Sequence, residues 1–196
     1  MAKRKSGRAL ARIENALELL LVGRFSEPYS APYRVLRQKP TYAIRHYGEE
    51  GAFAPGSRPP VLLVPPLMVT SEVFDIDPAI SGVQNLLSQG FDVWLTDFGS
   101  PEQKEGGMDR DLRDHVLAIS ETLDEILERT GRPVHLIGYS QGGMFVYETA
   151  AFRRSEGIAS CVTFGAPVDF HGNFKGIEED TARSFLRAGV TIFRAA

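Results

Sequence analysis

The chain has 196 residues, 43% of them apolar, which is enough for one substantial hydrophobic core and argues against a disordered or fibrous protein. Its net charge of −3, with no basic stripe beyond the first dozen residues, argues against nucleic-acid binding. The single cysteine, Cys161, cannot form an internal disulfide and lies in the apolar run 158–164. We therefore expect a buried thiol and a cytoplasmic protein.

The first 32 residues are predicted to form an amphipathic helix followed by a linker. Apolar residues recur at helical spacing over residues 7–23, while Glu14 and Glu18 interrupt what would otherwise resemble a signal peptide or a membrane span. The apolar face of this helix has two open roles: packing on the domain or a partner, and docking on a lipid or polymer surface. Two prolines in residues 25–32 indicate a linker, so we expect the main domain over residues 33–196.

Short apolar segments alternate with helical patterns through the rest of the chain. Strands are expected at residues 33–36, 41–47, 61–64, 93–97, 134–137 and 158–164. The run at 61–64 is apolar at every position, which is typical of a strand buried on both faces. This alternation predicts the α/β class, with a mainly parallel sheet covered on both faces.

Two helices are marked by their end signals. Asp77 is expected to cap a helix that has Pro78 at its first position and ends at Gly90. A longer helix is expected over about residues 109–130, with one apolar stripe and with Gly131 closing it.

The sequence Gly138-Tyr139-Ser140-Gln141-Gly142 has the form of a nucleophile elbow, a sharp turn between a strand and a helix. The turn is strained and leaves little room, so Gly138 and Gly142 supply space and permissive backbone angles. Ser140 would stand exposed at the start of the helix. There the N–H of Gln141 and the helix dipole can stabilise an oxyanion as an acyl group is attacked.

The order of these elements resembles the α/β-hydrolase fold, and more narrowly the polyhydroxyalkanoate synthases, especially their shorter two-subunit class. The segments that carry the resemblance are Leu-Leu-Val-Pro-Pro at 62–66, Phe-Asp-Ile at 74–76, Val-Trp-Leu-Thr-Asp-Phe-Gly at 93–99, Gly-Tyr-Ser-Gln-Gly-Gly at 138–143 and Pro-Val-Asp-Phe at 167–170. It covers residues from about Arg58 to Phe170.

The resemblance implies acyl transfer from a coenzyme A thioester through a covalent acyl-enzyme, with no cofactor. By position, Leu67 matches the loop residue whose N–H joins that of Gln141 in the oxyanion hole, and Met68 is a near alternative. Some relatives in this family are joined to an acyl-CoA ligase domain and look lipid-related, which favours a long-chain acyl or lipid ester substrate. The resemblance also allows an oligomer or an attached acyl-CoA ligase domain as partner. Association with lipid or granules would follow from the same resemblance.

The chain departs from this family at the nucleophile. The synthases carry cysteine at the elbow, whereas this chain carries Ser140. A serine hydroxyl needs a well-placed histidine to remove its proton, while a thiolate depends less on a base. Serine therefore favours an ester hydrolase, or an acyltransferase that forms oxyesters.

The second departure is that 56 residues follow Ser140, since 196 minus 140 is 56. The fold places its acid and its histidine on later strands, in the order serine, acid, histidine. We therefore expect the acid and base outside this chain, and the fold to be cut short after the start of a cap that begins near residue 172. Asp169 and His171 have the right order, but residues two apart can hardly adopt the usual geometry, so we expect a structural role for them.

The other histidines, His46, His115 and His135, are interpreted as surface or core residues, and no pair of histidines has metal-ligand spacing. Two functions remain open. The first is an acyltransferase or lipase-like enzyme with Ser140 as its nucleophile, and we expect these 196 residues alone to have no appreciable turnover. The second is a catalytically silent binding or assembly module that keeps the fold without a working triad.

Overall fold

The computed structural model describes residues 30–48, 51, 54–67, 71–103, 107–168 and 180–181. The predictions for residues 7–23, for Met68 and for residues 169–179, which include Asp169, His171 and the start of the cap, lie outside these residues. Within the described residues, no helix is long and apolar enough to cross a membrane.

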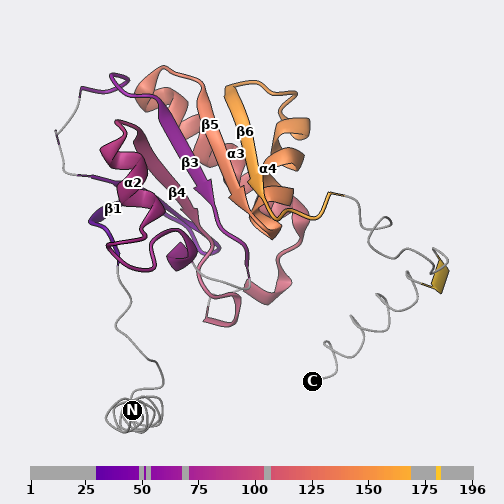
Figure 1. The fold of residues 1–196 in the computed structure, drawn as a ribbon. Helices are drawn as coiled ribbons and strands as arrows, with labels where there is room; N and C mark the ends of the chain where they lie inside the picture. Colours follow the sequence, from indigo (N-terminus) through magenta and orange to yellow (C-terminus); the bar gives the residue numbers. More distant parts are fainter. Residues whose placement is uncertain are drawn as a thin grey trace, which may run out of the picture.

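The described residues form a fold around a six-stranded sheet (Figure 1). Its strands are β1 (Tyr33–Gln38), β2 (Ala43–Tyr47), β3 (Pro60–Val64), β4 (Asp92–Asp97), β5 (Val134–Tyr139) and β6 (Ile158–Phe164), in the spatial order β1-β2-β4-β3-β5-β6. β2 pairs with β1 and β4 in antiparallel fashion, and the remaining neighbours are parallel. The predicted α/β class and mainly parallel sheet are confirmed.

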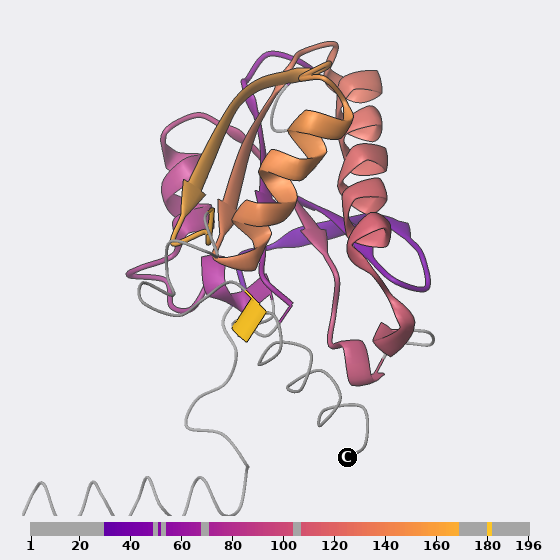
Figure 2. The same ribbon diagram turned by 90° about the vertical axis from the view of Figure 1, so that its right-hand side faces the viewer.

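Helices cover both faces of this sheet (Figure 2). α2 (Gly82–Ser88) lies on one face, and α3 (Leu112–Thr130) and α4 (Gln141–Phe152) lie on the other. In the described part of the chain, three short 3₁₀ segments lie in the connections: Ser71–Phe74, Pro101–Gln103 and Gly107–Asp109.

Alternate residues of β3 belong to two different hydrophobic clusters. Val61 and Leu63 pack in the cluster that includes Val83 of α2. Leu62 and Val64 pack in the cluster that includes side chains of α3 and α4. Because side chains alternate across a strand and both faces are covered, every residue of β3 is buried. The continuous apolar run predicted this correctly.

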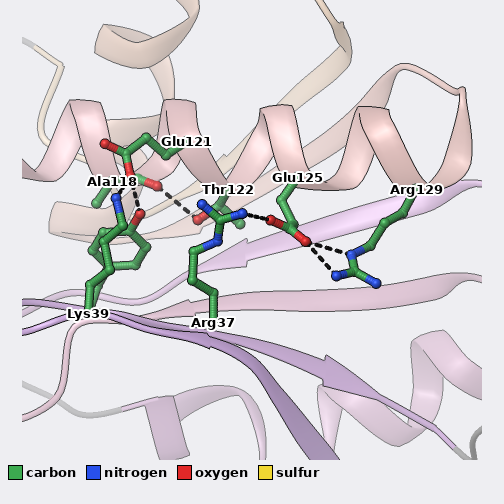
Figure 3. A network of polar contacts seen from close by, with 8 residues as sticks. Arg37, Lys39, Ala118, Glu121, Thr122, Glu125 and Arg129 are labelled. Carbon is green, nitrogen blue, oxygen red and sulfur yellow. Dashed lines mark hydrogen bonds and ion pairs between the residues drawn. The ribbon is translucent and has the colours of Figure 1, made fainter.

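A polar network ties the first strands to α3 (Figure 3). Glu125 forms ion pairs with Arg37 of β1 and with Arg129, and Glu121 accepts from Lys39. Burial of Glu125 works against its charge, but the hydrogen bond and charge of Arg129, with Arg37, hold its pKa below the ordinary value. The antiparallel hairpin is thereby attached to the long helix at the edge of the sheet.

The Asp75 carboxylate, in the predicted motif Phe-Asp-Ile, organises the loop that precedes α2. It is 2% exposed, and its two oxygens accept from the Ala31 N–H and the Ser81 hydroxyl, both at 2.5 Å. Ser81 in turn caps α2, because its Oγ accepts from the N–H of Gln84 at 2.9 Å. One buried carboxylate therefore joins the entry of the chain into the domain to the start of α2.

The predicted start of this helix was wrong. α2 begins at Gly82 after Ser81, instead of at Pro78 after Asp77. Asp77 forms a turn of its own, in which its side chain accepts from Ala79 N and its carbonyl from Ile80 N. Both residues have good N-cap chemistry, and only Ser81 is held by the buried Asp75.

Cys161 was also predicted wrongly, because it is exposed. β6 is paired on one side, with β5, and its residues are exposed or half-buried within the described part of the chain. Although the surface of Cys161 is accessible, its neighbours desolvate the thiol and raise its pKa. An apolar sequence alone does not distinguish a central strand from one at the edge of the described sheet.

His115 of α3 is a buried histidine, only 3% exposed, in an aromatic site. Its ring stacks on Phe145 with centroids 4.9 Å apart and contacts the edge of Phe98 at 5.0 Å. Its Nδ1 lies 2.6 Å from the carbonyl oxygen of Asp111 and donates to it, whereas buried Nε2 has no hydrogen-bond partner among the described residues. Burial lowers the pKa of His115.

This lowered pKa predicts that acid destabilises the fold through His115. The unfolded chain takes up the proton first, near the ordinary histidine value of about 6.5. The contribution of His115 to the unfolding free energy is therefore fully present above that pH. It falls as pH drops towards the lower pKa of the folded state, by at most about 1.4 kcal/mol per pH unit. The substitution His115→Phe should flatten the dependence of the unfolding free energy on pH below about 6.5. The unfolding free energy of both proteins would be measured by urea titration at several pH values. If it fell equally with pH in the two proteins, this prediction would be contradicted.

Candidate active site

Ser140 lies at the turn between β5 and α4, in a backbone conformation that is unusual for a residue with a side chain. Its φ is 53° and its ψ is −120°. Such angles cost free energy and persist only when the surroundings hold them. Here the Ser140 N–H donates to Phe164 O at 2.7 Å, and Gly143 N–H donates to Ser140 O at 2.9 Å. β6 and the first turn of α4 therefore hold the strained residue from both sides.

The glycines of the motif are required by close approaches of the backbone. A β-carbon on Gly138 would lie 2.5 Å from Gly142 O, and one on Gly142 would lie 2.1 Å from Val64 O. One on Gly143 would lie 2.7 Å from Cβ of Ala166. These distances are too short for real contacts, so only glycine lets α4 begin directly against β5 and the end of β3.

The Ser140 hydroxyl is not used to cap the helix. Serine at an N-cap usually accepts from the N–H two or three residues later, but Ser140 makes no such bond. The residue is half-buried, at the amino end of a 12-residue helix. The unusual backbone angles thus leave a hydroxyl beside a helix terminus that favours developing negative charge.

The structure brings the two predicted oxyanion residues together. Leu67 follows Pro65 and Pro66 at the end of β3, and its N–H donates to Oε1 of the Gln141 side chain at 3.2 Å. Gln141 is the first residue of α4. This side-chain contact, between residues 74 apart in sequence, was not anticipated, since no local pattern encodes it.

The predicted structural roles of the remaining histidines agree with their contacts. His46 pairs with Asp92 at 2.6 Å and stacks on Trp94, and Nδ1 of His135 lies 2.8 Å from the hydroxyl of Ser160. Within the described ranges, no group of three or more His, Cys, Asp or Glu residues could hold a metal ion.

The sequence model of the alpha/beta hydrolase fold matches residues 59–187. This chain belongs to the α/β-hydrolase fold family. The match contains β3, the turn at Ser140 and β6.

Two curated relatives and one solved structure refine the comparison. The poly(3-hydroxyalkanoate) polymerase subunit PhaC of Haloferax mediterranei is 38% identical over 96 residues, which cover 47% of this chain and 19% of that protein. The subunit PhaC of Rhizobium meliloti is 28% identical over 166 residues, which cover 82% and 27%. The thioesterase domain from the curacin biosynthetic pathway is 17% identical with a TM-score of 0.54, over 83% of this chain and 52% of that one.

These comparisons confirm the resemblance to the polyhydroxyalkanoate synthases. The likeness to the thioesterase domain, at 17% identity, shows the fold alone. The chain spans less than half the length of the curated relatives it matches, between 19% and 44%.

The contact at Gly142 predicts a destabilising substitution. Alanine is normally about 1 kcal/mol better than glycine inside a helix. In Gly142→Ala, however, the new methyl group would lie 2.1 Å from Val64 O and 2.8 Å from Pro65 O. We expect a loss of about 2 kcal/mol or more in the unfolding free energy, measured by urea titration.

Gly131→Ala is the matched control for Gly142→Ala. At Gly131 a β-carbon would meet nothing within 4 Å, and only the φ of +64° opposes it. The cost there should be about 1–2 kcal/mol. A Gly142→Ala protein that is as stable as the wild type would refute the packing of α4 against β3.

Proposed function

We propose that this chain carries the nucleophile and the oxyanion hole of an acyltransferase or ester hydrolase that works through an acyl-serine intermediate. The observation that carries the proposal is the position of Ser140, which stands in a strained turn with a hydroxyl that does not cap its helix. Strained residues cluster at functional sites, so a serine held in this conformation favours a chemical role.

In the first step, Oγ of Ser140 forms a bond to the acyl carbon and its proton passes to a general base. The carbonyl electrons move to oxygen and return as the bond to the thiol or alcohol breaks, and that leaving group takes the proton. An acceptor, either water or a second hydroxyl, then removes the acyl group by the same steps. The proposal requires a base and an acid from residues other than those described.

The oxyanion formed in each step would lie between two backbone donors. Gln141 is the first residue of α4, so its N–H has no carbonyl partner within its own helix, as for every first helical residue. The N–H of Leu67 faces the same turn, because its present acceptor is the side chain of Gln141. In a site that excludes water, each such donor typically increases kcat by a factor of about 10²–10³.

The substrate class we propose is an acyl thioester of coenzyme A or a lipid ester. Support for the thioester comes from the relatives named as poly(3-hydroxyalkanoate) polymerase subunits. Support for oxyesters comes from serine in place of cysteine, since an alkoxide nucleophile forms an oxyester intermediate that resembles its substrate in energy. A polymer end, glycerol and water all fit as acceptors.

The test is covalent labelling of the full-length protein by a fluorophosphonate, read by intact mass and peptide mapping. We expect one phosphonyl group on Ser140, and Ser140→Ala should lose at least about 10³-fold in labelling rate because the nucleophile is removed. Folding should remain near that of the wild type, since the side chain is half-buried and makes no cap.

Ser160→Ala is a demanding control for Ser140→Ala. Ser160 is an exposed serine that already lies 2.8 Å from a histidine nitrogen, but it stands in the middle of β6 instead of at an elbow. It should label as the wild type does. Absence of labelling in the wild type would favour the silent binding module, and labelling that persists in Ser140→Ala would refute the assignment of the nucleophile.

A further inference from the structure

The side chain of Gln141 occupies a donor that the proposed chemistry needs. The N–H of Leu67 has one hydrogen, and in this structure it points to Oε1 of Gln141 at 3.2 Å. That distance is at the long end of the range for a hydrogen bond between neutral groups. An acyl oxygen can therefore receive this N–H only if the glutamine oxygen gives it up.

Of the two partners, Gln141 is the one that can move. Leu67 follows Pro65 and Pro66, whose rings fix their backbone angles, and its side chain packs against the large core cluster. The carbonyl oxygens of Val64 and Pro65 also lie directly against Gly142. The Gln141 side chain, by contrast, has three rotatable bonds and is only half-buried.

We propose that the Gln141 amide is a displaceable acceptor, which holds the Leu67 N–H in place until the oxyanion replaces it. This rests on the proposed function of the site. Gln141 would then act in two ways: its backbone N–H contacts the oxyanion, and its side chain positions the second donor.

The chemistry of the competing acceptors gives this arrangement a consequence for catalysis. The carbonyl oxygen of a bound ester is neutral, as is the amide oxygen, so the two compete for Leu67 on similar terms. An oxyanion makes a shorter and stronger bond and displaces the amide. The Leu67 contact would therefore form mainly in the transition state, where it raises kcat without tightening substrate binding.

Two substitutions separate a displaceable acceptor from a residue that merely supports the loop. Gln141→Met keeps the length of the side chain and its helix propensity but removes the acceptor. Gln141→Glu keeps the shape and provides a charged acceptor, which holds the N–H more strongly and repels an oxyanion. Loss of mere support would impair both variants in the same direction.

The experiment measures hydrolysis of p-nitrophenyl butyrate and fluorophosphonate labelling by the full-length protein, between pH 4 and 8. For Gln141→Met we expect kcat/KM to rise by about 2- to 10-fold through a lower KM, because the ester carbonyl now meets an unopposed donor. For Gln141→Glu we expect a fall of at least about 10-fold at pH 7. Its ratio to the wild type should recover near pH 4–5, where the carboxylate takes up a proton.

The outcomes distinguish this inference from the proposed function. If the wild type does not label at Ser140, both fail. If it labels but the two variants change in the same direction, or the ratio of Gln141→Glu to the wild type does not depend on pH, the displaceable acceptor is refuted and the nucleophile stands. Both variants should keep a cooperative thermal melt, since the exchanged side chains are half-buried and similar in size.

Discussion

The structure around the site depends on one close contact, between the backbone at Gly142 and the carbonyl oxygen of Val64. A β-carbon at Gly142 would lie 2.1 Å from that oxygen, so the first turn of α4 rests directly on the end of β3. This contact sets the distance between the elbow and the loop that carries Leu67. Without it, the N–H of Leu67 and the first N–H groups of α4 would not face the same turn beside Ser140.

The rest of the fold holds these two elements in register. β3 lies between β4 and β5 and is buried on both faces, by α2 on one and by α3 and α4 on the other. β6 contributes directly, because Phe164 O accepts from the N–H of Ser140. The strained serine is thus stabilised by elements that precede it and follow it in the sequence. This explains why a conformation that costs free energy can persist at this position.

Much of this arrangement could be predicted from the sequence, because its signals are local. The apolar run at 61–64 predicts a strand buried on both faces, and the glycines around Ser140 predict a tight turn from a strand to a helix. Each pattern spans only a few residues. The errors arose where contacts distant in the sequence decided the outcome. Asp77 and Ser81 are both good helix caps, and the helix begins after Ser81 because Ser81 is bound to the buried Asp75. Cys161 lies in an apolar strand, and the exposure of that strand depends on its pairing in the sheet. The bond between Leu67 and Gln141 joins residues 74 apart, and only the folded chain shows it.

The central claim is that Ser140, Leu67 and Gln141 form one acyl-transfer site. It is tested most directly by a crystal structure of the full-length protein after reaction with a fluorophosphonate. We predict a bond from Oγ of Ser140 to phosphorus, and a phosphoryl oxygen within about 3.2 Å of the backbone nitrogens of both Leu67 and Gln141. The Gln141 amide oxygen should have left Leu67. A phosphoryl oxygen that points into solvent, or a phosphonyl group on another residue, would contradict the account.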